Sequence, residues 1–278
     1  MIQYLYLGRV DYDEGLRLQA EIEELRFAGR VDNMLLLLEH PPVLTLGRNA
    51  HSSNILASDE MLASRGVTIH EINRGGDVTY HGPGQLVGYP IFDLRSLRTA
   101  NGGRMGPVDF VRLMEEALIR LCAEFGVRAG RIKGLTGVWC GPADGGPLDE
   151  SSGNGRKIGA IGIHVSRGIT SHGFAFNVTT DLRDFALIVP CGISDHPVTS
   201  LAQEVQEPEG LPNLEAIAHQ AARQFGWVFD QQVLAVESLA ALRAQAAIAP
   251  VFPAEDTPLQ VPPEVERLKD SAERSVKA

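Results

Sequence analysis

The chain has 278 residues, of which 44% are hydrophobic and 22% charged, an ordinary composition for a soluble globular protein. Its formal net charge of −10 argues against general nucleic-acid binding, and its longest dense apolar run, Met34 to Leu38, is too short to span a membrane. Neither a signal peptide, a disulfide framework nor a C-x-x-C zinc motif is expected, which favours a reducing cytoplasm. The three cysteines are Cys122, Cys140 and Cys191.

The pattern of apolar residues predicts a mixed set of helices and strands. Pro107 suits the first position of one helix and Asn213 the N-cap of another. Helices are expected over residues 15–27, 107–125 and 214–225. Strands are expected over residues 34–38, 43–46, 67–72, 86–92, 135–140, 157–165 and 171–178. Because the strands cluster with helices inserted between them, the predicted fold class is α/β, of the mixed-sheet α+β kind rather than strict βαβ alternation.

A change of composition near residue 235 divides the sequence. We predict one domain over residues 1–235 and a C-terminal extension over residues 236–278. The extension begins as an alanine-rich helical stretch and then becomes rich in proline and charge, which predicts partial flexibility. Residues 141–155, rich in Gly, Ser, Asp and Pro, are expected to form a loop or hairpin excursion just before Lys157.

The segment Arg74–Gln85, with the sequence RGGDVTYHGPGQ, is the first candidate binding element. Its glycines allow a ligand to approach the backbone closely, and exposed backbone N–H groups in such loops bind carbonyl or phosphate oxygens. Arg74 suits a carboxylate or phosphate, and Tyr80 and His81 suit the polar end of an apolar slot. The alternative is a tight connection between strands, with His81 in the core. The spacing matches neither a dinucleotide fingerprint nor a P-loop, and no G-x-S-x-G motif occurs.

The second candidate is Lys157, in the sequence RKIGAIGI. Regular alternation places Lys157 on one face of a strand and Ala160 on the other. The small residues leave room for a ligand chain beside the backbone, with the amine at the closed end of a groove. The alternative is an edge lysine that discourages sheet pairing. His172, on the strand that follows, is interpreted first as a satisfied core or edge histidine and only second as a catalyst.

The third candidate is Cys191, in the sequence PCG. A thiol needs a cationic neighbour or a base to become a thiolate, and a lysine supplies either. A helix expected to begin near residues 197–200 would direct its N-terminal dipole toward the thiol and lower the thiol pKa, and nearby backbone N–H groups would form an oxyanion hole. The alternative is an inert buried cysteine, the interpretation we give to Cys122 and Cys140. Together the three segments favour acyl transfer through a cysteine thioester.

These motifs resemble the octanoyltransferase family of lipoate biosynthesis, also called lipoyl(octanoyl) transferases. The resemblance covers about residues 30–225, and its combination of segments is highly specific although each segment alone is weak. The excursion at 141–155 is longer than the usual family connection, and the sequence after residue 235 lies outside the match. The matching segments are RGGxVTYHGPGQ at 74–85, RKI at 156–158, HGxAxNV at 172–178 and PCG at 190–192.

The resemblance implies a fold like the catalytic domains of biotin and lipoate protein ligases. It implies that Cys191 takes octanoate from octanoyl-acyl carrier protein as a thioester and passes it to a lysine of the lipoyl domains of 2-oxoacid dehydrogenases or of the glycine-cleavage H protein. Lys157 would activate Cys191, as an ammonium or as a proton shuttle. No metal, nucleotide or other cofactor is implied, because the donor thioester is already activated. Substrate contacts carry over to Arg74, Gly75, Gly76, Asp77, Val78, Thr79, Tyr80, His81, Ala160, Ile161, Gly162, Gly173, Phe174 and Ala175.

Two rival interpretations stand beside this one. An ATP-dependent lipoate ligase of the same fold also uses a glycine-rich segment and a lysine, but its adenylate chemistry needs no thiol nucleophile. A non-catalytic module would bind acyl carrier or lipoyl domains without transfer, which leaves Lys157 and Cys191 without a role. Both rivals are therefore weaker than the transferase.

Overall fold

The computed structural model describes residues 1–149, 151, 154–189 and 196–248. Its larger sheet contains β1 (Ile2–Arg9), β2 (Asn33–Glu39), β6 (Gln85–Ile91), β7 (Ala129–Ile132), β8 (Leu135–Cys140), β9 (Arg156–Ser166), β10 (Ile169–Asn177) and β11 (Val233–Ala235). The strand order is β11-β1-β2-β6-β10-β9-β8-β7. Strand β1 pairs in parallel with β2 and β11, and the other neighbours are antiparallel. The sheet is thus mixed, as the sequence predicts.

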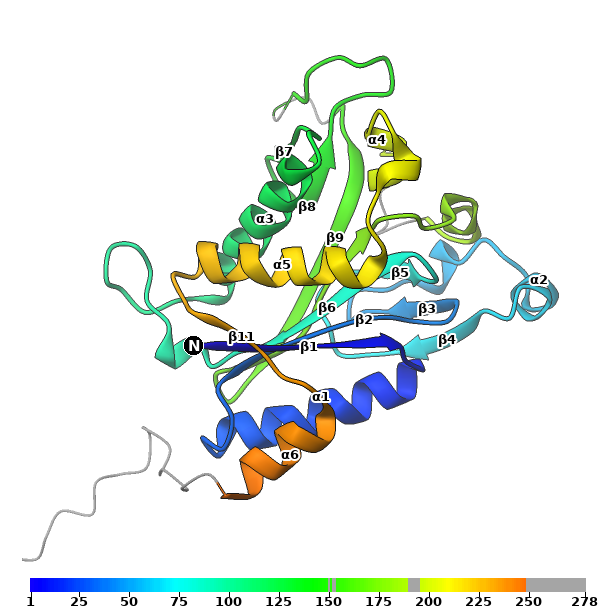
Figure 1. Cartoon of the computed structure of the whole chain (residues 1–278). Coiled ribbons are helices and arrows are strands. Elements are labelled where there is room, and N and C mark those ends of the chain that lie inside the picture. The colour runs from blue at the N-terminus through cyan, green and yellow to red at the C-terminus, as the bar shows by residue number, and fades with distance from the viewer. Residues whose placement is uncertain (150, 152–153, 190–195, 249–278) are drawn as a thin grey trace, which may run out of the picture.

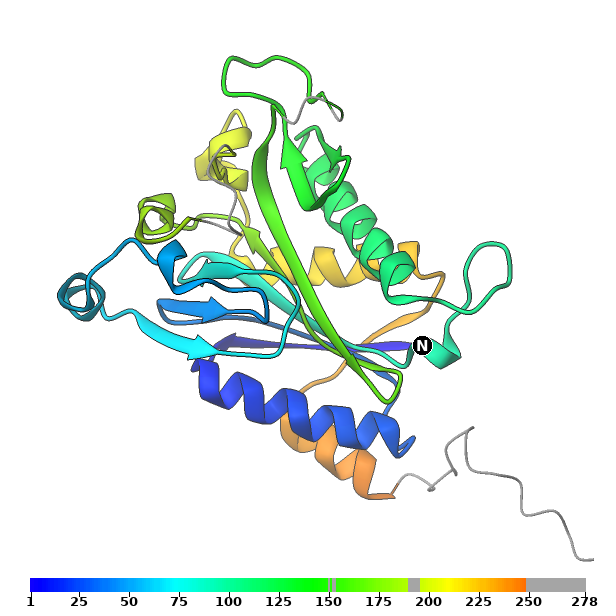
Figure 2. The same cartoon turned by 180° about the vertical axis from the view of Figure 1, so that it is seen from behind.

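Helices cover both faces of this sheet (Figure 1, and from behind in Figure 2). On one face, α3 (Pro107–Glu124) and α5 (Leu214–Val228) enclose the larger apolar core, in which Phe110 and Phe225 are fully buried. On the other face, α1 (Tyr12–Phe27) and α6 (Leu239–Ile248) pack over a second core. Asn213 caps α5, since its side-chain oxygen accepts a hydrogen bond from the backbone N–H of Ala216 at 2.8 Å.

The unbroken apolar run in β2 follows from its central place between these two cores. Leu35 and Leu37 belong to the core under α3 and α5, whereas Leu36 and Leu38 belong to the core under α1. Successive side chains of a strand point to opposite faces, so a strand that is covered on both sides needs apolar residues at every position.

A smaller sheet extends from the side of the larger one, on the right in Figure 1. It contains β4 (Thr68–Glu71), β3 (Val43–Leu46) and β5 (Val78–His81) in the order β4-β3-β5, with β4 parallel and β5 antiparallel to β3. Its apolar side chains pack with Leu62 of α2 (Asp59–Ser64) and with Phe185 of the 3-10 helix η3 (Leu182–Leu187). This sheet holds the end of the glycine-rich segment against the body of the molecule.

Every strand expected from the sequence, and each of the helices expected at 15–27, 107–125 and 214–225, is present with ends within three residues of the prediction. The alanine-rich stretch forms α6, as expected. The sequence did not predict β1, β5, β7 or β11, nor α2, η3, η1 (Ser52–Asn54), η2 (Leu94–Ser96) and η5 (Pro208–Gly210). The helix expected to begin near residues 197–200 is present as the short α4 (Leu201–Glu204).

Candidate active site

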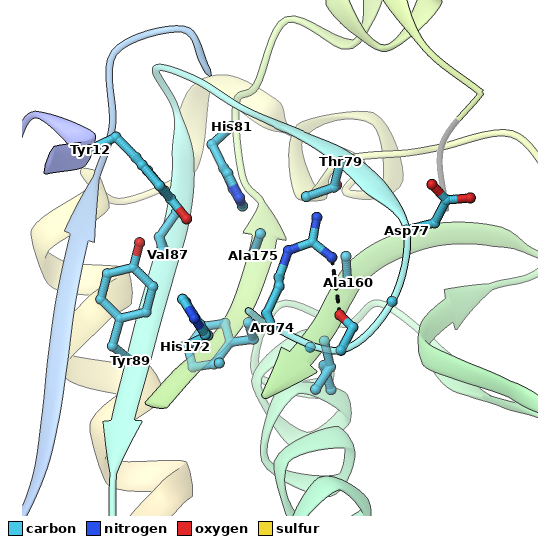
Figure 3. A pocket seen from close by; sticks show the side chains of 16 residues that line it. Tyr12, Arg74, Asp77, Thr79, His81, Val87, Tyr89, Ala160, His172 and Ala175 are labelled. Atoms are coloured by element: carbon cyan, nitrogen blue, oxygen red, sulfur yellow. Dashed lines mark hydrogen bonds between the residues drawn. The ribbon is translucent and has the colours of Figure 1, made fainter. Parts of the chain in front are cut away.

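The main pocket lies between the glycine-rich segment that leads into β5 and the strands β6, β9 and β10 (Figure 3). Its empty space, counted to the open mouth, is about 500 Å³. Small residues and apolar walls combine with a few polar groups, an arrangement typical of sites for small molecules. Twelve of the fourteen predicted substrate contacts line it: Arg74, Gly75, Gly76, Asp77, Thr79, His81, Ala160, Ile161, Gly162, Gly173, Phe174 and Ala175.

The other two predicted contacts, Val78 and Tyr80, lie on the opposite face of β5. Because side chains alternate along a strand, Thr79 and His81 line the main pocket while Val78 and Tyr80 pack in the core of the smaller sheet. The Tyr80 hydroxyl donates a hydrogen bond to the carboxylate of Asp184 at 2.8 Å, and burial raises the pKa of this tyrosine. The structure places both residues in the packing that supports the pocket rather than in its lining.

Arg74 shapes the glycine-rich loop from inside. Its Nη2 donates hydrogen bonds to the carbonyl oxygen of Thr45 at 2.7 Å and to the Thr45 hydroxyl at 3.0 Å, and its Nη1 donates to the carbonyl oxygen of Gly75 at 3.1 Å. The loop approaches Gly47 so closely that a Cβ there would lie 2.4 Å from the carbonyl oxygen of Gly76. Part of the hydrogen-bonding capacity of Arg74 is thus used to hold the loop.

A directed chain of hydrogen bonds runs from β5 toward the segment beside β9. Nε2 of Gln85 donates to Oδ1 of Asn177 at 2.9 Å, so Oε1 of Gln85 is the acceptor for Nδ1 of His81 at 2.8 Å. The other nitrogen of His81 faces the Thr45 hydroxyl at 3.4 Å. Nδ2 of Asn177 donates to the carbonyl oxygen of Thr199 at 2.9 Å. Burial lowers the pKa of His81 to about 3, so the ring is neutral near pH 7.

His172 also lines the main pocket. Its backbone φ is +56°, in the left-handed region that few residues with a side chain adopt. Its backbone N–H donates to Oε1 of Gln19 at 2.7 Å, and its Nε2 pairs with Oδ1 of Asn73 at 2.7 Å. Burial, and to a lesser extent the charge of Arg74, lowers the pKa of His172 to about 4. Its Nδ1 is buried and has no hydrogen-bond partner among the described residues.

Tyr12 and Tyr89 form another wall of the main pocket (Figure 3). Nδ1 of His40 donates to the carbonyl oxygen of Val10 at 2.6 Å, because a carbonyl can only accept. Burial lowers the pKa of His40 to about 4, so its neutral Nε2 accepts a hydrogen bond from the Tyr89 hydroxyl at 2.6 Å. The ring of Tyr12 stacks on His81 at 6.2 Å between centroids. This wall is polar but carries no formal charge near pH 7.

Lys157 lines a second hollow, the lysine pocket, which shares Thr79, Ala160 and Ala175 with the main pocket. Lys157 is only 8% exposed, and its Nζ lies 4.5 Å from the centre of the Trp139 ring. Burying a charged group requires compensating interactions, so this lysine is not a solvated surface residue. The remaining residues of the lysine pocket are Gln85, Asn177, Phe185 and Val198.

The expectation that Lys157 and Ala160 lie on opposite strand faces is wrong, because β9 contains a bulge. Gly159 pairs with Val138 of β8, and Lys157 pairs with the next residue of β8, Trp139. Ile158, between them, therefore has no partner and is the extra residue of the bulge. Ile158 belongs to the core under α3, and a Cβ on Gly159 would also point into that core. Lys157 is therefore turned to the same side as Ala160.

Cys191 lies outside the described residues, within the stretch 190–195. Both ends of the flanking chain are held by backbone hydrogen bonds. The N–H of Val189 donates to the carbonyl oxygen of Asn54 at 2.8 Å, and the N–H of Lys157 donates to the carbonyl oxygen of Pro197 at 2.8 Å. The chain that follows Cys191 thus pairs directly with β9 at the lysine.

The helix expected to begin near residues 197–200 starts only at Leu201, and α4 has four residues. The reason lies in the preceding segment, where Val198 forms a parallel bridge with Lys157 and the backbone is extended. So short a helix aligns too few peptide dipoles to shift the pKa of a thiol appreciably. The predicted contribution of a helix dipole to activation of Cys191 is therefore not supported.

Cys122 and Cys140 are buried free thiols, which agrees with their interpretation as structural residues. Burial raises the pKa of Cys140 to about 12 and raises that of Cys122 well above its ordinary value. Such thiols stay protonated and unreactive. Among residues whose placement is described, no group of three or more His, Cys, Asp or Glu is arranged to bind a metal ion. No helix in those ranges has both the length and the apolar character needed to cross a membrane.

Sequence reasoning missed Tyr12, Val87 and Tyr89 as pocket residues. The alternation within the strand at 86–92 does put Val87 and Tyr89 on one face, but it does not show that this face meets a ligand. Tyr12 carried no signal, because its position at the start of α1 becomes relevant only when that helix packs over β6 and β10. His172 was interpreted first as a core residue, and it is both buried and part of the lining.

Comparison with known proteins defines the class of this fold and site. Residues 11–226 match the family of lipoyl protein ligase A/B catalytic domains. A solved structure of a bi-partite lipoate protein ligase from Thermoplasma acidophilum superimposes with a TM-score of 0.61, over 89% of this chain and 91% of that chain, at 16% identity. The molecule is a catalytic domain of the lipoyl protein ligase A/B class, which confirms the predicted fold class.

More similar sequences narrow this class. An octanoyltransferase of Acidobacterium capsulatum is 62% identical over 239 residues, which cover 86% of this chain and 94% of the relative. An octanoyltransferase of Koribacter versatilis is 49% identical over 270 residues, covering 97% and 98%. The chain belongs to the octanoyltransferase family and is an acyltransferase. The family resemblance found in the sequence is confirmed.

Proposed function

We propose that the protein moves an octanoyl group from octanoyl-acyl carrier protein to a lysine of a lipoyl domain or of the glycine-cleavage H protein, through a thioester on Cys191. One observation carries the proposal. Buried Lys157 lines the lysine pocket, which shares three lining residues with the main pocket, and its backbone pairs with the chain that follows Cys191. Strand β9, the lysine pocket and the chain that follows Cys191 thus lie next to one another.

The proposed chemistry has two half-reactions. In the first, the thiolate of Cys191 attacks the donor thioester carbonyl, the carrier thiolate leaves, and the proton given up by Cys191 goes to that leaving group. In the second, the ε-amine of the acceptor lysine attacks the enzyme thioester, an amide bond forms, and the Cys191 thiolate leaves and regains a proton from the amine. Lys157 would stabilise the thiolate as an ammonium or carry the proton. The first half-reaction needs no ATP, because exchange of one thioester for another changes the free energy little.

The main pocket suits an aliphatic chain. Ala160, Gly162 and Ala175 leave space beside the backbone, and Val87 adds an apolar wall. Burying about seven methylene-like groups at ~0.8 kcal/mol each would supply roughly 5–6 kcal/mol, and each group changes binding about fourfold. Donors with six, eight and twelve carbons should therefore react at different rates in a single-turnover assay. Equal rates for all three would contradict this use of the pocket.

An ATP-dependent lipoate ligase is the rival within the same class, because the Thermoplasma acidophilum structure with this fold is described as a ligase. The fold therefore does not separate the two activities. The much higher identity to octanoyltransferases favours the transferase. Activity of a Cys191→Ala variant with free lipoate and ATP would reverse this preference.

The direct test is the intact mass of the protein after mixing with octanoyl-acyl carrier protein in the absence of ATP. We expect a thiol-labile gain of one octanoyl group in the native protein and in Cys122→Ser, and no gain in Cys191→Ala. No adduct on the native protein, with octanoylation of a lipoyl domain still occurring, would point to direct transfer and overturn the thioester. If no adduct formed and no octanoyl group reached the lipoyl domain, the ATP-dependent ligase or the non-catalytic binding module would become the favoured interpretation.

We also propose a cytoplasmic location for this reaction. Free thiols at Cys122 and Cys140 fit a reducing compartment. Measuring octanoyltransferase activity in separated cell fractions tests this, and activity confined to an extracytoplasmic fraction would contradict it.

A further inference from the structure

The main pocket and the lysine pocket share one face of the sheet. Residues two apart along a strand point to the same side. On β6, Gln85 lines the lysine pocket, and Val87 and Tyr89 line the main pocket. On β10, Ala175 lines both pockets and Gly173 lines the main one. The two pockets are therefore successive parts of one groove along these strands, the sheet groove, which runs from the lysine pocket to Tyr89.

The middle of the sheet groove is floored by small residues. Ala160 and Gly162 of β9 pair directly with Ala175 and Gly173 of β10. Because these positions carry at most a methyl group, an extended chain has room to lie flat against the strands. From the lysine pocket to Tyr89, β6 advances four residues, a rise of about 13 Å. The space offered to the chain thus has a limited length.

The sheet groove ends where α1 comes down onto the sheet. This helix begins at Tyr12, which lines the main pocket. It approaches closely because Gly15 has no side chain: a Cβ there would lie 3.0 Å from Cε1 of His40 and 3.8 Å from Cε2 of Tyr89. Ile91, the next residue on this face of β6, is fully buried in the core under α1. Tyr89 therefore stands between the groove and that core.

The Tyr89 ring is held in place through its hydroxyl. The hydroxyl donates to Nε2 of His40 at 2.6 Å, and Nδ1 of His40 donates to the carbonyl oxygen of Val10 at 2.6 Å. The ring of Tyr12 packs edge-on against His40, with 5.0 Å between centroids. Figure 3 shows Tyr12 and Tyr89 side by side, on the side of the pocket away from Ala160. Displacing so well buried a ring would disrupt close packing and break a buried hydrogen bond.

We propose that Tyr89 is a specificity-determining residue that closes the sheet groove and so sets the longest acyl chain that the enzyme transfers efficiently. The proposal rests on the proposed function, in which Cys191 carries the acyl group beside Lys157. His40 acts through Tyr89 and is a positioning residue. Each methylene that fits in the groove adds buried apolar surface, whereas the first one beyond it pushes against a fixed ring. The wall thus turns a gradual gain with chain length into an upper limit.

The test compares chain lengths within each variant, so that a general loss of activity cancels. The probes are acyl carrier protein loaded with groups of six, eight, ten and twelve carbons, and the readout is the single-turnover rate of acyl-enzyme formation. In Tyr89→Ala, we expect the ratio of the ten-carbon rate to the eight-carbon rate to rise about tenfold, because two more methylenes find room. Tyr89→Leu, which disturbs the core less, should shift the ratio in the same direction.

The matched control is Ile91→Ala, on the same strand and the same face. It removes a side chain that is buried in the same core but leaves the Tyr89 ring in place. Its ratio of rates should equal that of the native protein. An unchanged ratio in both Tyr89 variants, or an equal rise in Ile91→Ala, would overturn the role of Tyr89.

The role of His40 is tested by a double-mutant cycle. Tyr89→Phe and His40→Phe each delete the same hydrogen bond while leaving an aromatic ring at the position. Each should raise the ratio of the ten-carbon to the eight-carbon rate by about threefold, and the double variant should raise it no further. A His40→Phe variant that slows all chain lengths equally, with an unchanged ratio, would show that His40 does not position the wall.

A binding measurement separates this proposal from the proposed function. Calorimetry with octanoate, decanoate and dodecanoate needs no acyl transfer. We expect Tyr89→Ala to bind decanoate about tenfold more tightly, relative to octanoate, than the native protein does. That result in a protein that forms no acyl-enzyme would support the wall and count against the thioester on Cys191. Acyl-enzyme formation with the same chain-length preference in the native protein and in Tyr89→Ala would do the reverse.

Discussion

At the scale of single residues, the site is polar without being highly charged. His40, His81 and His172 are each buried, and burial lowers the pKa of all three well below the ordinary value. Their neighbours assign the proton of His40 and of His81 to Nδ1, because a carbonyl or amide oxygen faces that atom in each ring. Neutral rings place no formal charge beside an aliphatic chain.

Asn177 is the residue on which the directed hydrogen-bond chain depends. An Asn177→Ala substitution leaves Nε2 of Gln85 with one fewer acceptor and the carbonyl oxygen of Thr199 without its side-chain donor. We expect the free energy of unfolding to fall by about 1–3 kcal/mol in urea denaturation. Octanoyl-enzyme formation should also slow, because the segment beside Lys157 loosens.

The matched control for that substitution is Asn101→Ala, since Asn101 is exposed in a loop. It should change the free energy of unfolding by no more than about 0.5 kcal/mol. If both alanine variants were equally stable, the hydrogen bonds of Asn177 would not support the site.

At the scale of elements, β8 and β9 together decide where the lysine points. The bulge at Ile158 reverses the face of Lys157, and Gly137 gives its stem room. The neighbouring extended segment explains why α4 is short, since Val198 pairs with β9 before the helix begins. These local irregularities would be defects in a regular sheet, but here each places a side chain at the pocket.

Gly137→Ala should therefore be more damaging than an ordinary glycine substitution. Its new Cβ would meet the Gly159 carbonyl oxygen at 2.7 Å and press on the lysine stem. Gly134→Ala is the control, because Gly134 also has positive φ but nothing within 4 Å of an added Cβ. We expect about 1 kcal/mol of destabilisation for the control from backbone strain and about 1–3 kcal/mol more for Gly137→Ala, with lower activity. Thermal unfolding and single-turnover kinetics measure both, and equal losses would contradict the steric argument.

The helix α6 bears on the proposed division of the chain at residue 235. Leu242 is fully buried and Ala246 is 3% exposed in the core that α6 shares with α1, so this part of the extension packs on the domain. Leu242→Ala should lower the free energy of unfolding by about 2–4 kcal/mol in a single transition. Ile248→Ala, at a residue that is 85% exposed, is the control and should have little effect. An unchanged transition for Leu242→Ala would show that α6 does not contribute to the stability of the domain.

At the scale of the whole molecule, the three buried histidines predict acid lability. In the unfolded chain they bind protons below about pH 6.5, whereas in the folded chain they bind them only near pH 4 for His40 and His172 and near pH 3 for His81. The unfolded state therefore holds more protons between these values, and stability falls as the pH drops. By pH 5 each histidine lowers the free energy of unfolding by up to roughly 2 kcal/mol, because a difference of one pKa unit corresponds to about 1.4 kcal/mol.

Urea denaturation between pH 7 and pH 4 measures this loss. His172→Asn should reduce the slope of stability against pH, whereas a substitution of exposed His219 should leave it unchanged. A free energy of unfolding that stays level from pH 7 to pH 5 would mean that the buried histidines do not set the acid limit.

The sequence alone predicted the long helices, every long strand except β1, and twelve of the sixteen residues that line the main pocket. Long apolar periods predicted α1, α3 and α5, because a helix that covers a sheet needs one apolar stripe. The short strands β5, β7 and β11 went unrecognised, since three or four residues carry too little periodicity and form strands only when a neighbour pairs with them. Tyr12 and Tyr89 were missed for a related reason, as only packing brings α1 over that face.

The sequence by itself determined the family, the fold class and the residue types of the site. Motifs at fixed spacing identify the backbone conformations and the side chains that the members of a family share. Only the tertiary structure decided which side of β9 Lys157 occupies and which partners surround it. A one-residue bulge reverses the face of a strand and leaves no mark in the apolar pattern. The contact with Trp139 arises from that pairing, because neighbours across a sheet are set by register and not by distance along the chain.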